Sequence, residues 1–226
     1  MIVSMHIPKT AGTSFGLRLE STFGARMLRD YGDWVEINTP EAEMRRKARA
    51  EAMRASRDVL LRDYDVIHGH FAANKYSGLF PNAAFIAFFR DPYQHAISGY
   101  QQVLRLPNHD HPAVKLIIQG SMTLIDSIAA LPNPQSCYMA QMAIEDLAMV
   151  GLAEQYERSV ALFEAVFGRK MLPQTVCENV NTNRQGETYP IDVAVQDAVD
   201  THRKADVELY RRACEQFARL TARHGL

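Results

Sequence analysis

Short apolar segments alternate with longer segments of helical periodicity along this chain, and the alternation predicts an α/β fold with a parallel, three-layer sheet and right-handed crossovers. The strand candidates are residues 1–7, 64–71, 83–89 and 148–154. The segment 83–89 is a continuous apolar run, which is typical of a parallel strand covered on both faces. Because open α/β sheets bind ligands at the carboxyl ends of their strands, the residues that follow these segments are the first candidates for function.

The helices between these strands have recognisable ends. Thr39 and Pro40 form a helix-start signal, and the helix that they open is expected to run to about Asp63. Its expected packed face is a thin apolar stripe made of Ala48, Ala52, Ala55 and Val59. Further helices are expected after residue 91, over much of 113–147, and over 155–167 and 191–220. Residues 23–38 are expected to form a connection that could hold one short strand, and 174–179 to form an edge strand.

Length and composition bound the class of protein. A chain of 226 residues can bury one substantial core, and we expect a single domain over residues 1–226. The net charge of −1 argues against a protein that mainly binds nucleic acid or an acidic membrane surface, so an anion site must be local. Three widely spaced cysteines predict neither a disulfide framework nor a zinc cluster. Because the first strand begins at Met1 and no long apolar run is present, we expect a cytoplasmic protein without a membrane partner.

The first strand candidate leads through a polar turn into a helix. A loop that enters a helix N-terminus points unpaired amide N–H groups at one place, where a phosphate or sulfate can bind. Lys9 adds a positive charge and Gly12 allows close approach of the backbone. Hydroxyl donors are available from Thr10, Thr13 and Ser14. An ordinary strand-to-helix turn with a capping hydroxyl remains the simpler interpretation of the loop taken alone.

Two further strand ends carry polar side chains. The segment 64–71 ends in His68-Gly69-His70, and alternation along a strand places both imidazoles on the same side. The apolar run 83–89 stops at Arg90-Asp91-Pro92, where Asp91 is predicted to cap the next helix. The charged side chain of Arg90 is expected in the crevice at the carboxyl edge. The loop at Lys9, the two histidines and Arg90 are therefore predicted to converge.

These segments resemble the nucleotide signatures of sulfotransferases that use 3′-phosphoadenosine 5′-phosphosulfate (PAPS). Residues 6–15, His-Ile-Pro-Lys-Thr-Ala-Gly-Thr-Ser-Phe, resemble the family's 5′-phosphosulfate loop, in particular that of the carbohydrate-type heparan sulfate and uronosyl 2-O-sulfotransferases. Residues 90–100 resemble the signature R-D-P-x-x-R-x-x-S-x-Y, in which Arg and Ser bind the 3′-phosphate. Here those positions are Arg90 and Ser98, whereas His95 stands where the family usually has a second Arg. Later segments, including 133–140, 150–159 and 206–210, also resemble the family.

The resemblance implies a P-loop-NTPase-like sulfotransferase fold and transfer of a sulfuryl group from PAPS to a hydroxyl acceptor, leaving 3′-phosphoadenosine 5′-phosphate (PAP). The expected acceptor is a carbohydrate or another small alcohol. The resemblance also implies that Lys9 stabilises the leaving phosphate and that His70, assisted by His68, removes the acceptor proton. The expected nucleotide-binding residues are Lys9, Thr10, Ala11, Gly12, Thr13, Ser14, Arg90, Ser98 and Arg184, the last in a loop that covers the nucleotide. The sulfuryl group carries less negative charge than a phosphoryl group, so no metal is required.

Two alternatives remain from the sequence. An ATP-dependent small-molecule kinase is disfavoured because Lys9 precedes Gly12, whereas the nucleoside-triphosphate loop G-x-x-x-x-G-K-[ST] has the opposite order. A noncatalytic nucleotide-binding module would keep the loop without turnover. Retention of both His68 and His70 argues against that second class without excluding it.

Overall fold

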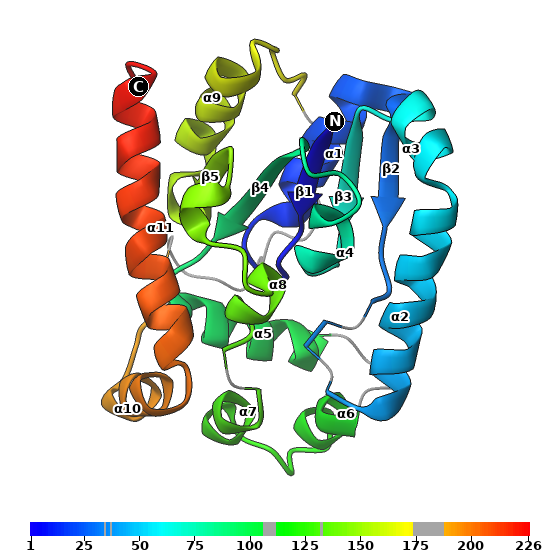
Figure 1. Cartoon of the computed structure of the whole chain (residues 1–226). Helices are drawn as coiled ribbons and strands as arrows, with labels where there is room; N and C mark the ends of the chain where they lie inside the picture. Colours follow the sequence, from blue (N-terminus) through cyan, green and yellow to red (C-terminus); the bar gives the residue numbers. More distant parts are fainter. Residues whose placement is uncertain (34, 37, 106–111, 132, 174–187) are drawn as a thin grey trace.

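The structure, a computed structural model, describes residues 1–33, 35–36, 38–105, 112–131, 133–173 and 188–226 (Figure 1). Its centre is a five-stranded sheet in the order β2-β3-β1-β4-β5, with every neighbouring pair parallel. The strands are β1 (Ile2–Met5), β2 (Met27–Asp30), β3 (Val66–Gly69), β4 (Ala84–Phe89) and β5 (Met149–Leu152). This arrangement confirms the predicted parallel α/β sheet.

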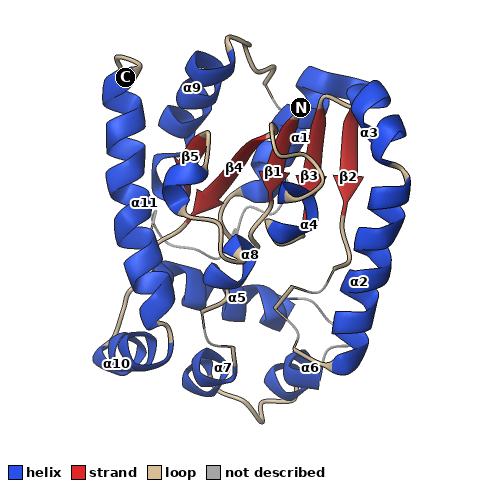
Figure 2. Cartoon of the chain, in the orientation of Figure 1, coloured by secondary structure: helices blue, strands red, loops and turns tan. Residues whose placement is uncertain are grey.

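Helices cover both faces and both edges of the sheet. In Figure 1, α1 (Gly12–Phe23) lies behind the strands, whereas α4 (Asn74–Ser77) and α8 (Ser136–Met139) lie in front. The α1 side chain of Phe15 contacts Phe88 of β4 and Phe163 of α9 (Tyr156–Phe167), so α1 and α9 share one face. At the edges lie α2 (Pro40–Ala55) and α3 (Arg57–Asp63) beside β2, and α11 (Lys204–Arg223) beside β5 (Figure 2). The three layers match the prediction.

The remaining helices lie beyond the carboxyl ends of the strands. They are α5 (Pro92–Arg105), α6 (Pro112–Ile118), α7 (Leu124–Ala130) and α10 (Val193–His202), and α5, α7 and α10 contact one another (Figure 2). Short 3₁₀ turns span Gly24–Arg26, Ile144–Asp146 and Ala153–Gln155. A small apolar cluster, separate from the main core, joins α5 to α7 and α10. None of the helices within the described ranges is long and apolar enough to span a membrane.

Several predicted helix ends are confirmed. The Thr39 hydroxyl accepts a hydrogen bond from the Ala42 amide at 3.3 Å, so Thr39 caps α2 as expected. The Asp91 carboxylate accepts from the amides of Tyr93 and Gln94, both at 3.0 Å. The single predicted helix 39–63 is divided at Ser56 into α2 and α3. The expected edge strand 174–179 lies outside the described residues.

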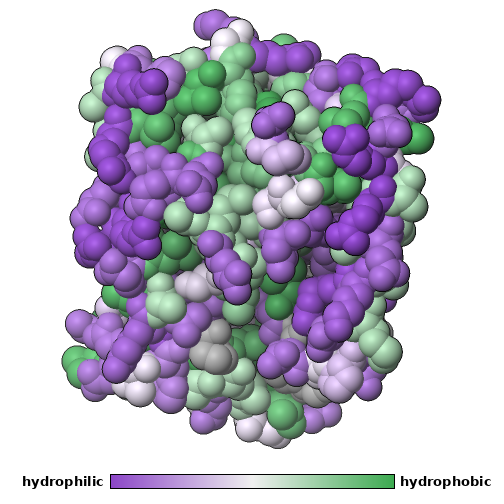
Figure 3. Space-filling view, viewed as in Figure 1, coloured by the Kyte–Doolittle hydropathy of each residue, from purple (hydrophilic) through white to green (hydrophobic). Residues whose placement is uncertain are grey.

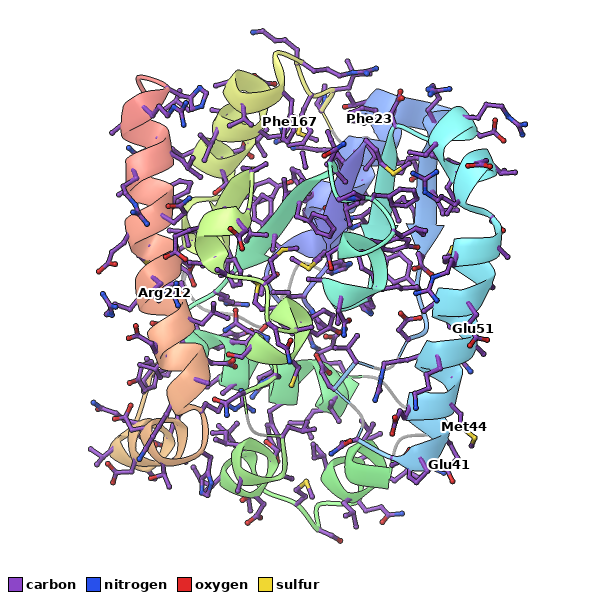
Figure 4. The ribbon with its side chains drawn as sticks, viewed as in Figure 1. Phe23, Glu41, Met44, Glu51, Phe167 and Arg212 are labelled. Carbon is purple, nitrogen blue, oxygen red and sulfur yellow. The ribbon has the colours of Figure 1, made fainter. Side chains whose placement is uncertain are left out.

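The predicted apolar stripe of α2 and α3 is wrong, because the alanines at 48, 52 and 55 and Val59 are all exposed. The helix is held instead by Arg49, which reaches Asp30 at 2.5 Å and Asp33 at 2.6 Å. Leaving two buried carboxylates without cationic partners costs more free energy than leaving an alanine methyl group exposed. The ion pairs of Arg49 therefore determine which face of α2 is turned inward. Met44 and Glu51 project away from the sheet in Figure 4.

The surface seen in the same orientation reflects this arrangement. Hydrophilic residues gather along the two sides of the molecule, over α2 and over α11, with more hydrophobic surface between them (Figure 3). On α11, the exposed Arg211 and the half-exposed Arg212 are paired with glutamates, Arg212 with Glu145 at 2.5 Å. The predicted helix 191–220 is divided at Arg203, which separates α10 from α11.

Candidate functional site

The loop between β1 and α1 has the backbone geometry of an open helix N-terminus. Lys9 and Ala11 adopt the left-handed conformation, with φ of 66° and 70°. Ala11 is the N-cap, and no side chain caps the helix. The interpretation of this loop as an ordinary capped turn is therefore wrong, because neither Thr nor Ser supplies a cap. The amide N–H groups of the first turn are left without a side-chain partner, as an anion site requires.

The side chains of the loop divide into structural and available groups. The Thr10 hydroxyl is buried and donates to the Ile7 carbonyl at 2.8 Å, so it closes the loop and is not available to a ligand. Thr13 and Ser14 are half-buried in the first turn of α1. Gly12 packs directly on the His6 ring, since an added Cβ would lie 2.0 Å from its Cδ2 atom. Any larger residue at position 12 would displace either the loop or the imidazole.

Lys9 carries an uncompensated charge in the part of the chain that the structure describes, because no ion-pair partner for its ammonium is found there. Its side chain is half-buried. Burial, and then the charges of Arg90 and Arg105, lower its pKa to about 8. At neutral pH the amine is still mostly protonated, so it is a cation held among cations. Such a group would be stabilised by an anion placed beside it.

Arg90 connects the end of β4 to this loop. Its guanidinium donates to the Lys9 carbonyl at 3.1 Å, which joins two segments separated by 81 residues. Its amide donates to the Gln135 side-chain oxygen at 3.0 Å, and its guanidinium lies 4.0 Å from Glu154. Ser98 lies on α5 and is buried. The structure thus brings the two predicted nucleotide segments together, with Arg90 in direct contact with the loop.

His95 occupies the position where the resembled signature has an arginine, and it supports the loop without adding charge. Its Nε2 atom lies 2.9 Å from the Pro8 carbonyl, which fixes Nε2 as the protonated nitrogen. The ring is buried, and its Nδ1 atom has no hydrogen-bond partner. Burial, followed by the charges of Arg203, Arg90 and Lys9, lowers its pKa to about 3. His95 is therefore neutral at physiological pH and positions the loop through a hydrogen bond.

The two predicted catalytic histidines lie on the same side of β3, around a third one. The His6 ring stacks on His68 at 5.2 Å between ring centroids and meets the edge of His70 at 4.4 Å. Tyr31 completes this histidine cluster, with its hydroxyl 3.0 Å from the His6 Nδ1 atom and its ring 4.7 Å from His70. His6 and Tyr31 were not predicted as site residues. His6 is part of the loop segment, and its place just before Pro8 was the signal available in the sequence.

The environments of His68 and His70 differ. His68 is fully buried, its Nδ1 lies 2.9 Å from the Ser4 hydroxyl, and burial lowers its pKa to about 3. His70 is half-exposed as a residue, burial lowers its pKa to about 4, and its Nε2 has no partner. Of these two histidines, only His70 is partly exposed as a residue, and its Nε2 atom is buried. Gly69 offers no room for an acceptor, because the Asp30 carbonyl would be 1.7 Å from an added Cβ.

A cavity of about 930 Å³ lies between α2, α4 and the segments that follow β2 and β3. Ala72, two residues after His70, and Asp33, two residues after Tyr31, both line it. The charged lining comes from α2, α4 and the segment after β2, and consists of Asp33, Glu36, Glu43, Arg46, Lys47 and Lys75. Lys75 is paired with Asp33 at 2.9 Å. His70, Lys9 and Arg90 do not line this cavity.

Neither the predicted nucleotide-binding residue Arg184 nor a metal site is found among the described residues. Arg184 lies outside the described residues. No group of three or more potential metal ligands is found among the residues that the structure describes.

The fold and site define a parallel α/β protein whose candidate site is a strand–loop–helix turn at the carboxyl edge of the sheet. No protein-family model and no curated protein matches the chain. Among solved structures it is similar to a mouse sulfotransferase, SULT7A1, complexed with PAP, with 12% sequence identity and a TM-score of 0.39 over 92% of this chain and 66% of that chain. The chain thus spans just under two thirds of that protein's length. A similarity this distant decides no function, which has to be argued from the site.

Proposed function

We propose that this protein is a sulfotransferase that moves a sulfuryl group from PAPS to a hydroxyl acceptor. The observation that carries the proposal is the contact between Arg90 and the Lys9 carbonyl at 3.1 Å. It joins the two segments that resemble the 5′-phosphosulfate and 3′-phosphate signatures, although they are far apart in the sequence. Two anion-binding groups at one place suit a nucleotide with phosphates on both sides of its ribose.

The loop has what the donor half of the reaction needs. The first-turn amides of α1 and the positive end of its dipole would hold the 5′-phosphosulfate. Lys9 would stabilise the charge that develops on the phosphate oxygen as its bond to sulfur breaks. The half-burial of Lys9 increases the value of that charge, because fewer water molecules screen it. Thr13 and Ser14 are placed to add hydroxyl donors.

His70 is proposed as the base for the acceptor half. The acceptor oxygen would form a bond to sulfur while His70 accepts its proton on Nε2. This nitrogen is buried and has no partner among the described residues, so acceptor binding has to open access to it. A pKa near 4 keeps the imidazole unprotonated at neutral pH but makes it a weak base. Proton transfer should therefore accompany the formation of the oxygen–sulfur bond. His68 is proposed to assist only by holding the cluster, because it is fully buried.

The acceptor is proposed to bind in the cavity lined by Ala72 and Asp33 and to extend from there toward His70, which does not itself line the cavity. Its volume suits a sugar or another small alcohol, and we propose a carbohydrate-type hydroxyl as the acceptor. The protein is proposed to act as one cytoplasmic domain that needs no metal.

Calorimetry with PAP, ATP and adenosine 5′-phosphosulfate tests the proposal. PAP should bind more tightly than either of the others, since only PAP presents a 3′-phosphate to Arg90 and Ser98. The Arg90→Ala variant should bind PAP about 10- to 100-fold more weakly, on the scale of 1.5–3 kcal/mol for a hydrogen bond to a charged group. Preferential binding of ATP with magnesium would favour the kinase alternative. Binding of PAP without any sulfuryl transfer to a panel of alcohols would favour a noncatalytic module.

A further inference from the structure

Arg203 is an unusual residue at the junction of α10 and α11. Its side chain is 4% exposed, and its amide donates to the Val199 carbonyl at 2.8 Å. Val199 belongs to the apolar cluster that packs α10 against Ala96 and Ile97 of α5. Arg203 therefore follows, one helical turn later, a residue that is fixed against the helix that carries His95 and Ser98.

The structure shows no hydrogen bond from the Arg203 guanidinium to the described residues. Its Nε atom is buried and unsatisfied. The nearby Asp206 carboxylate does not pair with it, because its oxygens accept from the Gln135 amide and from the amide and hydroxyl of Ser136. An arginine does not lose its proton in a protein. Burying this cation without a partner is costly, unless a ligand supplies the missing anion.

The electrostatic surroundings place this charge near the loop. Arg203 has the largest effect of the three cations that lower the pKa of His95, ahead of Arg90 and Lys9. His95 in turn lies 2.9 Å from the Pro8 carbonyl of the loop. Arg203, Arg90 and Lys9 therefore all act electrostatically on His95, the position where the resembled signature has an additional arginine and this chain has a neutral histidine.

We propose that Arg203 is a further binding residue for the 3′-phosphate, and that it supplies from the α10–α11 junction the charge that His95 does not carry. The proposal rests on the proposed nucleotide function. It explains why a cation is buried without a partner in the free protein. The negative charges of Asp206 and Glu36 then stabilise the guanidinium electrostatically, and its hydrogen-bond donors stay available to the phosphate.

The test compares PAP with adenosine 5′-phosphosulfate, which lacks the 3′-phosphate. In Arg203→Gln, PAP affinity should fall about 10- to 100-fold, as expected for a charge-assisted hydrogen bond, while adenosine 5′-phosphosulfate affinity stays within about twofold. Arg212→Gln is the matched control, because Arg212 also lies on α11, labelled in Figure 4, and is a half-exposed arginine paired with Glu145. It should leave the affinity for both ligands unchanged.

A second variant tests the replacement of charge directly. Adding His95→Arg to Arg203→Gln should restore part of the PAP affinity, since the arginine then stands where the resembled signature has it. Arg203→Lys, which keeps the charge but not the planar fork, should give an intermediate loss and serves if the glutamine variant does not fold.

The outcomes separate the two proposals. Equal losses for both ligands, or unchanged PAP affinity in both Arg203 variants, would overturn the role of Arg203 and leave the sulfotransferase proposal standing. Absence of PAP binding to the unaltered protein would overturn both.

Discussion

Acidification should destabilise this protein steeply between pH 7 and pH 5, because four histidines, three of them buried and His70 half-buried, are held neutral. Burial lowers the pKa of His6, His68, His70 and His95, to about 3, 4 and 3 for the last three. In the unfolded chain each imidazole titrates near pH 6.5. Below that pH the unfolded state binds protons that the folded state does not bind. The free energy of unfolding is therefore highest above pH 6.5 and decreases as the pH falls toward the pKa values of the folded-state histidines.

The magnitude follows from the reference pKa alone while the folded histidines stay neutral. Protonation of one unfolded histidine between pH 7 and pH 5 lowers the free energy of unfolding by about 1.9 kcal/mol. Four histidines together amount to about 7–8 kcal/mol, which is comparable to the whole stability of a typical domain.

One buried acid acts in the opposite direction. Burial raises the pKa of Glu36 to about 7, so the folded state takes up a proton there on acidification while the unfolded state, with a pKa near 4.5, does not yet. Between pH 7 and pH 5, this group raises the free energy of unfolding by about 2 kcal/mol. The net expectation is a loss of about 5–6 kcal/mol between pH 7 and pH 5.

Urea unfolding followed by circular dichroism at pH 7, 6 and 5 measures this loss. His95→Gln removes one titrating group while its amide can still donate to the Pro8 carbonyl, so the difference between pH 7 and pH 5 should shrink by about 1.9 kcal/mol. His202→Gln is the control, because His202 is exposed at the end of α10. A free energy of unfolding that changes by less than about 1 kcal/mol over this range would refute the neutral histidine cluster.

Three further predictions concern the site. Lys9→Ala should lower kcat by roughly 10²–10³ and change PAP affinity much less, since its charge is most useful in the transition state; steady-state kinetics would contradict this if only KM rose. His70→Ala should lower kcat by about 10²–10⁴, and activity within threefold of the unaltered enzyme at saturating PAPS would remove it as the base. Gly12→Ala should weaken PAP binding and lower the melting temperature, because the new methyl group meets the His6 ring; calorimetry and a thermal melt showing neither change would mean that the loop can shift freely.

The sequence predicted the sheet and the loop well because their signals are local. A few adjacent residues are enough to predict each of these features: the apolar run ending at Arg90, the polar turn at Lys9, and the caps at Thr39 and Asp91. The packed side of α2 could not be predicted, because it depends on ion pairs between Arg49 and two carboxylates, Asp30 and Asp33, which lie at and after the end of β2. Helical periodicity contains no information about such a partner.

The site was predicted only where strand ends define it. The positions of Lys9, His70 and Arg90 follow from the rule for parallel sheets. Tyr31 follows the edge strand β2, whose existence was left open, so its contact with His70 had no sequence signal. Arg203 lies far along the chain, and only the packing of α10 on α5 brings it near His95.

The left-handed backbone of Lys9 and Ala11 bears on how the loop could be engineered. Each such residue costs roughly 1–2 kcal/mol relative to a right-handed conformation, a cost that glycine would avoid. The chain bears this cost at two positions in three residues, so the loop is shaped before any ligand arrives. Glycine at position 11 should make the folded loop less strained and the unfolded chain more flexible, with partly cancelling effects on stability. Ligand binding would then have to supply the ordering that alanine now supplies in advance, which makes position 11 a means of exchanging affinity for loop mobility.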